Sequence, residues 1–117
     1  MAVSLPVPEA YVTKDGSRIR ELVHPLFAPG LGMSLAEAEV AAGGRTRAHF
    51  HTSFDEIYYC LEGAGVLYVN GEALPFSPGV YHFMPKGSTH YLSATTKLRL
   101  LCCCSPAYTH EDTVLLE

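Results

Sequence analysis

The sequence predicts an all-β fold, a sandwich or barrel built from short strands. From Ser34 onward, turn-forming Gly, Pro, Asn and Ser residues recur at short intervals. The runs between these turns are rich in Val, Ile, Tyr, Phe and Leu, which favour strands over helices. The pair Asn70-Gly71, flanked by apolar residues on both sides, is the strongest hairpin signal. Short strands at such spacing are typical of antiparallel sandwiches and barrels.

The length of 117 residues indicates one domain, residues 1–117. Four prolines punctuate residues 1–34, which we expect to form an N-terminal arm with short strands, one of them near residues 19–23. Residues 35–106 form the predicted core of the barrel, and residues 107–117 a C-terminal tail. Residues 35–41 could continue from a Ser34 helix cap, but in an all-β chain they are interpreted as a strand.

Composition argues against several classes of partner. The net charge is −4 and the eight Lys and Arg residues are scattered, so we expect no nucleic-acid partner. No apolar run reaches the roughly 20 residues of a membrane span, so no membrane partner is expected. Residues 1–8 lack the pattern of a secretory signal, and a cytoplasmic location is expected. Cys60 and the consecutive residues 102–104 show no disulfide spacing and are predicted to be reduced, mostly buried thiols, with a redox or metal-ligand role as the alternative.

Four residues stand out as potential metal ligands: His49, His51, Glu56 and His90. Three imidazoles and a carboxylate make a full protein ligand set for a divalent transition metal. In a strand, His49 and His51 share a face and lie about 6.6 Å apart along the backbone. Glu56 lies at an odd offset from His51, so residues 52–55 must form a turn or bulge that resets the alternation. Tyr58 then shares the face of Glu56.

The spacing resembles the two sequence motifs of the cupin superfamily, and of small single-domain bacterial cupins in particular. The first motif is complete, from Gly43 to Gly63: Gly-GRTRA-His-Phe-His-TSFD-Glu-IYYCLE-Gly. The second begins at Gly79 and includes His90: Gly-VYHFM-Pro-Lys-Gly-ST-His-YLS-Ala. Ala94 stands where the second motif has Asn, which is not a ligand. Together the motifs cover about residues 43–94.

The resemblance implies a double-stranded β-helix, the jelly-roll barrel of cupins, with a metal at its mouth. It also implies that His49, His51, Glu56 and His90 bind one divalent transition metal and leave two positions for water or substrate. Fe, Mn, Ni and Zn all remain open as the metal. The alternative interpretation places these polar residues on a surface hairpin or loop.

Strand alternation extends the predicted site. Arg45 and Arg47 share the parity of His49, so we expect them to point inward, where Arg47 would anchor a substrate anion. Alternatively, both arginines reach solvent at the rim. Tyr58 is expected to donate a hydrogen bond to substrate, or else to be a core aromatic residue. The opposite face of this strand, with Ile57 and Tyr59, is also apolar, which favours cover by the arm or by a second subunit and thus a homodimer.

Three functions compete for this sequence. The first is a metal-dependent enzyme acting on a small polar or anionic molecule, for which a dioxygenase is favoured over a non-redox isomerase or lyase. Catalytic roles are then expected for Tyr58 and Arg47. The second is a metal-dependent module that binds a metabolite or sugar without turnover. The third is a purely structural barrel.

Overall fold

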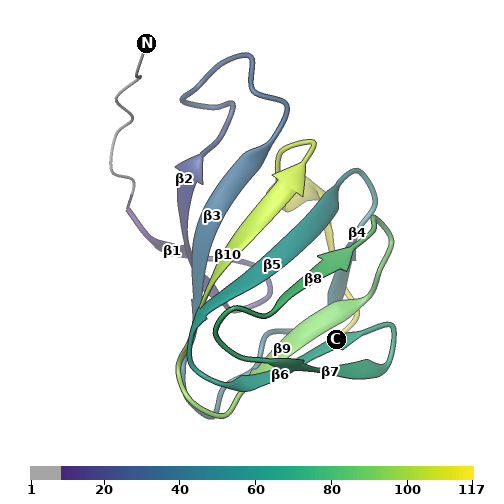
Figure 1. Cartoon of the computed structure of the whole chain (residues 1–117). Coiled ribbons are helices and arrows are strands. Elements are labelled where there is room, and N and C mark those ends of the chain that lie inside the picture. Colours follow the sequence, from purple (N-terminus) through teal and green to yellow (C-terminus); the bar gives the residue numbers. More distant parts are fainter. Residues whose placement is uncertain (1–8) are drawn as a thin grey trace.

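The computed structural model describes residues 9–117, which form eleven β-strands and one short 3-10 helix, η1 (His110–Asp112). The strands form two antiparallel sheets (Figure 1). The larger sheet has the order β1 (Tyr11–Val12), β2 (Arg18–Val23), β3 (Ser34–Val40), β10 (Leu98–Ser105), β5 (Asp55–Glu62) and β8 (Tyr81–Met84). The smaller sheet has the order β11 (Thr113–Leu115), β4 (His49–His51), β9 (His90–Ala94), β6 (Gly65–Val69) and β7 (Glu72–Phe76). The all-β prediction is confirmed.

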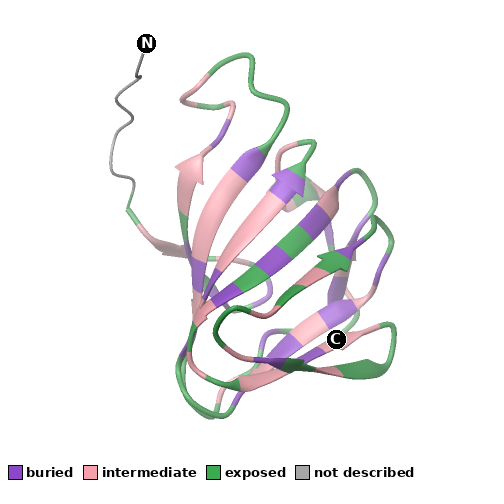
Figure 2. Ribbon diagram, in the orientation of Figure 1, coloured by how far each residue is buried: buried purple, intermediate pink, exposed green. Residues whose placement is uncertain are grey.

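The two sheets enclose one hydrophobic core. It combines Tyr58 and Leu100 of the larger sheet with Leu67 and Leu92 of the smaller one. Burial alternates along the strands (Figure 2), as expected when one face of each sheet is covered. In β10 this alternation turns the face of Leu98, Leu100 and Cys104 inward. All four cysteines are free thiols.

The predicted hairpin at Asn70-Gly71 joins β6 to β7. Both turn residues have positive φ, 49° for Asn70 and 83° for Gly71. Two successive residues of positive φ suit the type I′ turn, whose twist matches that of the flanking strands. All of residues 35–41 except Ala41 lie in β3 (Ser34–Val40), so the strand interpretation of this stretch is also confirmed.

Segments before and after the central strands complete both sheets. β2 covers the expected strand at residues 19–23 and pairs with β3, whereas β11 pairs with β4. The Lys14 Nζ atom donates to the carbonyl oxygen of His110 at 2.8 Å, joining the two segments. Within residues 9–117 no helix is long and apolar enough to cross a membrane. The stretch 1–8, on which the signal-peptide argument rested, lies outside the described residues.

Candidate metal centre

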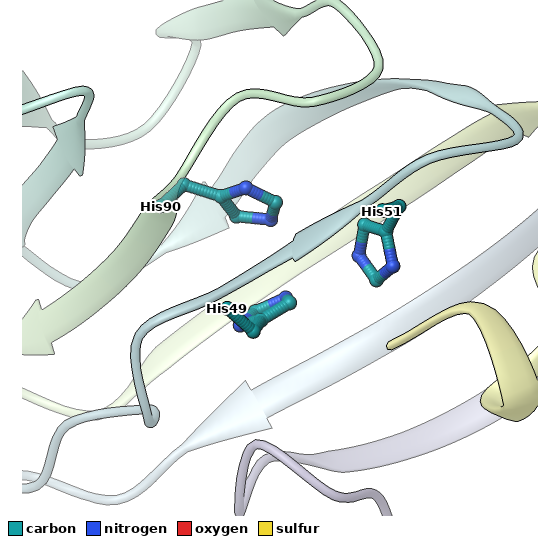
Figure 3. A group of neighbouring side chains, drawn as sticks. All are labelled: His49, His51 and His90. Atoms are coloured by element: carbon teal, nitrogen blue, oxygen red, sulfur yellow. The ribbon is translucent and has the colours of Figure 1, made fainter. Parts of the chain in front are cut away.

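Strands β4 and β9 bring three imidazoles together. His49 and His51 are both buried on the inward face of β4, and His49 lies opposite His90 in the pairing of the two strands. The ring centroids of His49 and His90 are 4.3 Å apart, and those of His49 and His51 are 4.9 Å apart. The nearest ring nitrogens of all three residues lie within 4.8 Å of one another (Figure 3). The expected shared face of His49 and His51 is therefore present, with His90 beside it.

Backbone carbonyls orient two of these rings. Nδ1 of His49 lies 2.8 Å from the carbonyl oxygen of Arg47, and Nδ1 of His90 lies 3.0 Å from that of Ser88. A carbonyl oxygen only accepts hydrogen bonds, so each Nδ1 carries the proton and each Nε2 keeps a free lone pair. Nδ1 of His51 faces the hydroxyl of Thr113 at 3.4 Å. Such outer contacts fix ring tautomer and orientation at metal sites.

Glu56 joins the imidazoles after the expected turn. Residues 52–54 separate β4 from β5, and the carboxylate of Asp112 accepts hydrogen bonds from the backbone N–H groups of Thr52 and Ser53. Glu56 then opens the inward face of β5. Its Oε1 lies 3.1 Å from Nε2 of His90 and 3.6 Å from Nε2 of His51. The predicted reset of strand alternation is thus observed.

Two buried atoms of this cluster lack hydrogen-bond partners. Among residues 9–117, neither Oε1 of Glu56 nor Nε2 of His90 has one, although both atoms are inaccessible to solvent. Buried polar atoms are rarely left in this state, and each such case calls for an explanation such as a bound ion. Two facing lone pairs fit a shared cation. The three histidines could therefore bind a metal ion.

The protonation of the cluster suits this interpretation. Burial is the main cause that lowers the pKa of His51, to about 4, and it also lowers the pKa of His49. Burial opposes the charged form of Glu56, but the neighbouring imidazoles outweigh it and the pKa of this carboxyl is lowered. For His90, burial is outweighed by Glu56, which raises the pKa of the imidazole. The lowered pKa values keep His49 and His51 neutral and Glu56 ionised, and a bound cation would displace the proton that Glu56 favours on His90. Imidazoles and a carboxylate are ligands that divalent transition metals accept.

A cavity opens beside the imidazoles, between the inner faces of the two sheets. The centre of a water-sized molecule can occupy about 40 Å³ within it, and the empty space is about 610 Å³ when open solvent at its mouth is included. The walls are largely apolar, with Ile19, Val40, Leu92 and Leu100 among them. The polar lining includes Asp15, Glu21, Glu56, Tyr58, Cys102, Tyr108 and Thr113. The arrangement is an apolar pocket with a few convergent polar groups, which is typical of small-molecule sites.

Comparison with known proteins identifies the family. The family described as the cupin domain matches residues 36–104, more than half of the sequence. The chain belongs to the cupin family. An uncharacterised protein of Methanocaldococcus jannaschii is 43% identical over 109 residues, which cover 92% of this cupin and 87% of that protein. L-ectoine synthase of Wolinella succinogenes is 32% identical over 83 residues, 69% of this cupin but only 63% of that enzyme.

Solved structures share the fold. Ectoine synthase from P. lautus superposes with a TM-score of 0.75 at 27% identity, covering 91% of this cupin and 80% of that chain. The Streptomyces nucleoside dehydratase Pac13 has a TM-score of 0.77 at 20% identity, covering 100% and 92%. At that identity the second likeness shows the fold alone. The predicted jelly-roll cupin barrel is confirmed.

Tyr58 lies inside the cupin barrel, as its shared face with Glu56 predicts. Its ring centroid is 5.6 Å from that of His90, and its side chain lines the cavity. Burial, followed by the nearby Glu56 carboxylate, raises the pKa of the Tyr58 hydroxyl well above its usual range. The hydroxyl therefore stays protonated and remains a hydrogen-bond donor.

Arg47 lies outside the cavity, contrary to the inward orientation expected for it. It is exposed, and its guanidinium donates to the backbone carbonyl oxygen of Glu117, whereas Arg45 pairs with the Glu117 carboxylate. The alternation fails because Thr46 is the inward residue here: it exchanges hydrogen bonds with Leu92 through its N–H and its hydroxyl. The rim alternative describes the orientation of both arginines in the structure.

Asp15, Phe54 and Tyr108 contribute to the site but were missed in the sequence. Asp15 lies in the turn between β1 and β2, where the local sequence indicates a turn but no ligand-type role. Phe54 lies in the turn before Glu56. Phe54 is 1% exposed and stacks on His51 with ring centroids 4.4 Å apart. Only the apolar character of Phe54 within a polar turn could have signalled its burial.

The remaining histidines of the described structure contact carbonyl oxygens or tyrosine hydroxyls away from the cluster. His24 is buried with Nε2 2.8 Å from the carbonyl oxygen of Tyr108, and His82 contacts the carbonyl of Pro75 at 3.4 Å. His110 lies between the hydroxyls of Tyr108 and Tyr11, at 3.1 Å and 3.0 Å. Among residues 9–117, none of these three belongs to the cluster of ring nitrogens.

Proposed function

We propose that this cupin is a metal-dependent enzyme that performs a non-redox elimination or cyclisation on a small polar molecule. The observation that carries the proposal is the pair of buried atoms without partners, Oε1 of Glu56 and Nε2 of His90, which lie 3.1 Å apart, with Glu56 lining the cavity. His49, His51, Glu56 and His90 would hold a divalent ion. Such an ion, when bound, supplies Lewis-acid polarisation of a substrate oxygen.

We favour a non-redox reaction over the dioxygenase expected first, because enzymes that this chain resembles in sequence are named as synthases. L-ectoine synthase is one of these relatives and is similar in sequence to most of this chain. Ectoine synthase from P. lautus is also similar in structure. This cupin spans less than two thirds of the Wolinella succinogenes enzyme. We therefore extend only the reaction class to it and leave the substrate open.

The residues of this chain supply positioning and proton donation. The carbonyls of Arg47 and Ser88 hold the rings of His49, which lines the cavity, and of His90, whose Nε2 faces Glu56. The protonated hydroxyl of Tyr58, whose side chain lines the cavity, would donate a hydrogen bond to substrate. The apolar walls exclude water from the reacting group, which strengthens every polar contact made there.

Elemental analysis of the purified protein tests the metal centre. We expect about one divalent transition metal per chain, retained through gentle purification, and loss of that metal in His51→Ala. His82→Ala is the matched control and should keep the metal, because His82 contacts Pro75 rather than the cluster. Metal-free wild-type protein, or full metal content in His51→Ala, would contradict the proposal.

Oxygen consumption separates the two reaction classes. Iron-loaded protein incubated with a panel of small amines, alcohols and carboxylic acids should consume no oxygen above a buffer control. Product analysis of the same mixtures by mass spectrometry should instead reveal loss of water or ammonia. Stoichiometric oxygen uptake with any member of the panel would restore the dioxygenase interpretation.

We also propose a homodimer formed through the outer face of β5 and β8. Four exposed apolar side chains form cross-strand pairs at this end of the larger sheet: Ile57 with Phe83 and Tyr59 with Tyr81. A patch of this kind on a sheet face favours protein association. Light scattering at micromolar concentration should give the mass of two subunits for wild type and of one for Tyr81→Glu. The control Val12→Glu, an exposed residue at the opposite end of the same sheet, should remain dimeric.

A further inference from the structure

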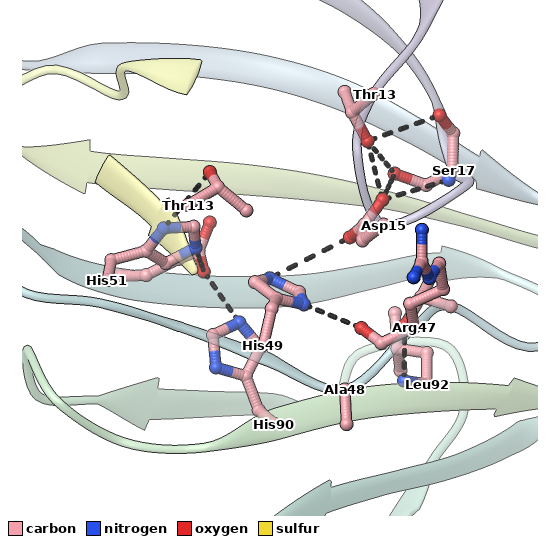
Figure 4. A network of polar contacts seen from close by, with 12 residues as sticks. Thr13, Asp15, Ser17, Arg47, Ala48, His49, His51, His90, Leu92 and Thr113 are labelled. Atoms are coloured by element: carbon pink, nitrogen blue, oxygen red, sulfur yellow. Dashed lines mark hydrogen bonds and ion pairs between the residues drawn. The ribbon is translucent and has the colours of Figure 1, made fainter. Parts of the chain in front are cut away.

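The turn between β1 and β2 places an acidic side chain against the histidine cluster. Oδ1 of Asp15 accepts three hydrogen bonds, from the Thr13 hydroxyl at 2.5 Å, the Ser17 N–H at 2.9 Å and the Ser17 hydroxyl at 2.7 Å (Figure 4). These three hydrogen bonds hold the carboxylate in place through Oδ1 alone. The other oxygen, Oδ2, makes no hydrogen bond to any residue in 9–117, and it points toward His49.

The same turn is anchored to the strand that carries the cluster. The N–H of Arg47 donates to the backbone carbonyl oxygen of Asp15 at 2.7 Å. Asp15 is only 8% exposed and lines the cavity. Its Oδ2 lies 3.8 Å from Nε2 of His49, beyond hydrogen-bond distance. A free carboxylate oxygen is thus held rigidly beside the point on which the imidazoles converge.

The charge of the cavity points to the kind of ligand. Besides Glu56 its lining includes Asp15 and Glu21, and among the described lining residues there is no lysine or arginine. The carboxylate of Glu21 already accepts a hydrogen bond from the Tyr11 hydroxyl at 2.9 Å. A carboxylate oxygen can only accept hydrogen bonds when ionised, and its strongest partners are charged N–H donors.

We infer that Oδ2 of Asp15 recognises a protonated amine on a small aliphatic molecule, whose reacting group then faces His49, His51 and His90. This inference rests on the proposed function, because it takes that molecule to be the substrate. The apolar lining, with Val40, Leu92 and Leu100, would accept its carbon chain. The substrate class is therefore an amine rather than the anion that the sequence suggested through Arg47.

Three probes of equal length and different charge test this inference: butylammonium, 1-butanol and butyrate. Their affinities are measured by amide chemical-shift titration of the full-length protein, both metal-free and loaded with zinc. We expect wild type to bind butylammonium about tenfold more tightly than butyrate, the difference that one hydrogen bond to a charged group provides. Equal affinity for the three probes would overturn the inference.

Asp15→Asn isolates the cavity-facing atom. Asparagine keeps Oδ1 as the acceptor that orders the turn and replaces Oδ2 by an amide, so the fold is preserved while the carboxylate is lost. We expect about a tenfold loss of butylammonium affinity, with zinc content unchanged. Glu72→Gln removes one exposed charge from β7 and should leave the preference intact. An unchanged preference in Asp15→Asn, or loss of zinc that makes Asp15 a metal ligand, would refute the recognition role.

A second variant and the titration of metal-free protein distinguish failure of this inference from failure of the proposed metal chemistry. Glu21→Gln changes cavity charge without touching the turn, and we expect a smaller loss of butylammonium preference, since Glu21 is already engaged by Tyr11. If neither variant alters the preference, the cavity does not select amines. If wild type binds no zinc yet prefers butylammonium, the proposed metal chemistry fails while Asp15 keeps its role.

Discussion

Truncating Phe54 should destabilise this cupin more than the position of Phe54 in a turn suggests. Its side chain is 1% exposed, stacks on His51, and contacts Tyr108 edge-on at 5.7 Å between ring centroids. Replacing a buried Phe by Ala costs about 3–5 kcal/mol. With an unfolding entropy of about 2.1 cal/mol/K per residue, 117 residues give about 0.25 kcal/mol/K. Phe54→Ala should therefore lower the Tm by about 12–20 °C.

Calorimetry on metal-free protein measures this shift without a contribution from metal binding. Leu26→Ala is the control: Leu26 is 83% exposed, so its truncation should change the stability by less than about 0.5 kcal/mol. In Phe54→Ala the ring of His51 also loses its stacking partner, so zinc affinity should fall as well. A Tm within about 4 °C of wild type would show that Phe54 does not fill the core, and the reasoning would fail.

Three further results are expected. Arg47→Ala should leave zinc content and butylammonium affinity within about twofold of wild type, because its side chain faces outward; a tenfold loss in either titration would return it to the site. Asp112→Ala should cost about 0.5–1 kcal/mol at pH 6 in urea unfolding, with allowance for solvent screening. The hydrogen bonds of Asp112 lower the pKa of its carboxyl from 3.8 to about 2, so its contribution is complete above pH 3.8 and lost as pH falls through about 2, where variant and wild type should converge. Gly65→Ala would place a Cβ 2.2 Å from the carbonyl oxygen of Ser93 and should cost about 1–3 kcal/mol, whereas Gly32→Ala meets no atom within 4 Å and should be nearly neutral in the same assay.

Strand alternation predicted the centre of this molecule well. It placed His49 and His51 on one face, required a turn before Glu56, and put Tyr58 inside. The shared faces needed only the two-residue period within one strand, and the turn followed from the odd offset between His51 and Glu56. The hairpin at Asn70-Gly71 was predictable for a related reason, since its turn type demands positive φ at both positions.

The same reasoning failed where the backbone departs from a regular strand. Thr46 and His49 both point inward although their offset is odd, because β4 begins only at His49 and Thr46 is held by Leu92. Arg47 was misplaced for that reason. Asp15 could not have been found by periodicity at all. Its place beside His49 depends on a contact between segments more than 30 residues apart, and no local pattern encodes it.

The residues around the histidine cluster come from two parts of the chain, one inside and one outside the region that matches the cupin family. The ligand-type residues lie within the matched cupin region, residues 36–104, whereas Asp15, Tyr108 and Thr113 lie before and after it. The flanking segments supply none of the four ligand-type residues, but they support them, since Thr113 faces Nδ1 of His51 and β11 pairs with β4. Exchange of these segments between cupins would therefore change the lining of the cavity and the support of the imidazoles together. Engineering of substrate choice in this protein accordingly has to preserve the contacts that β11 makes with β4.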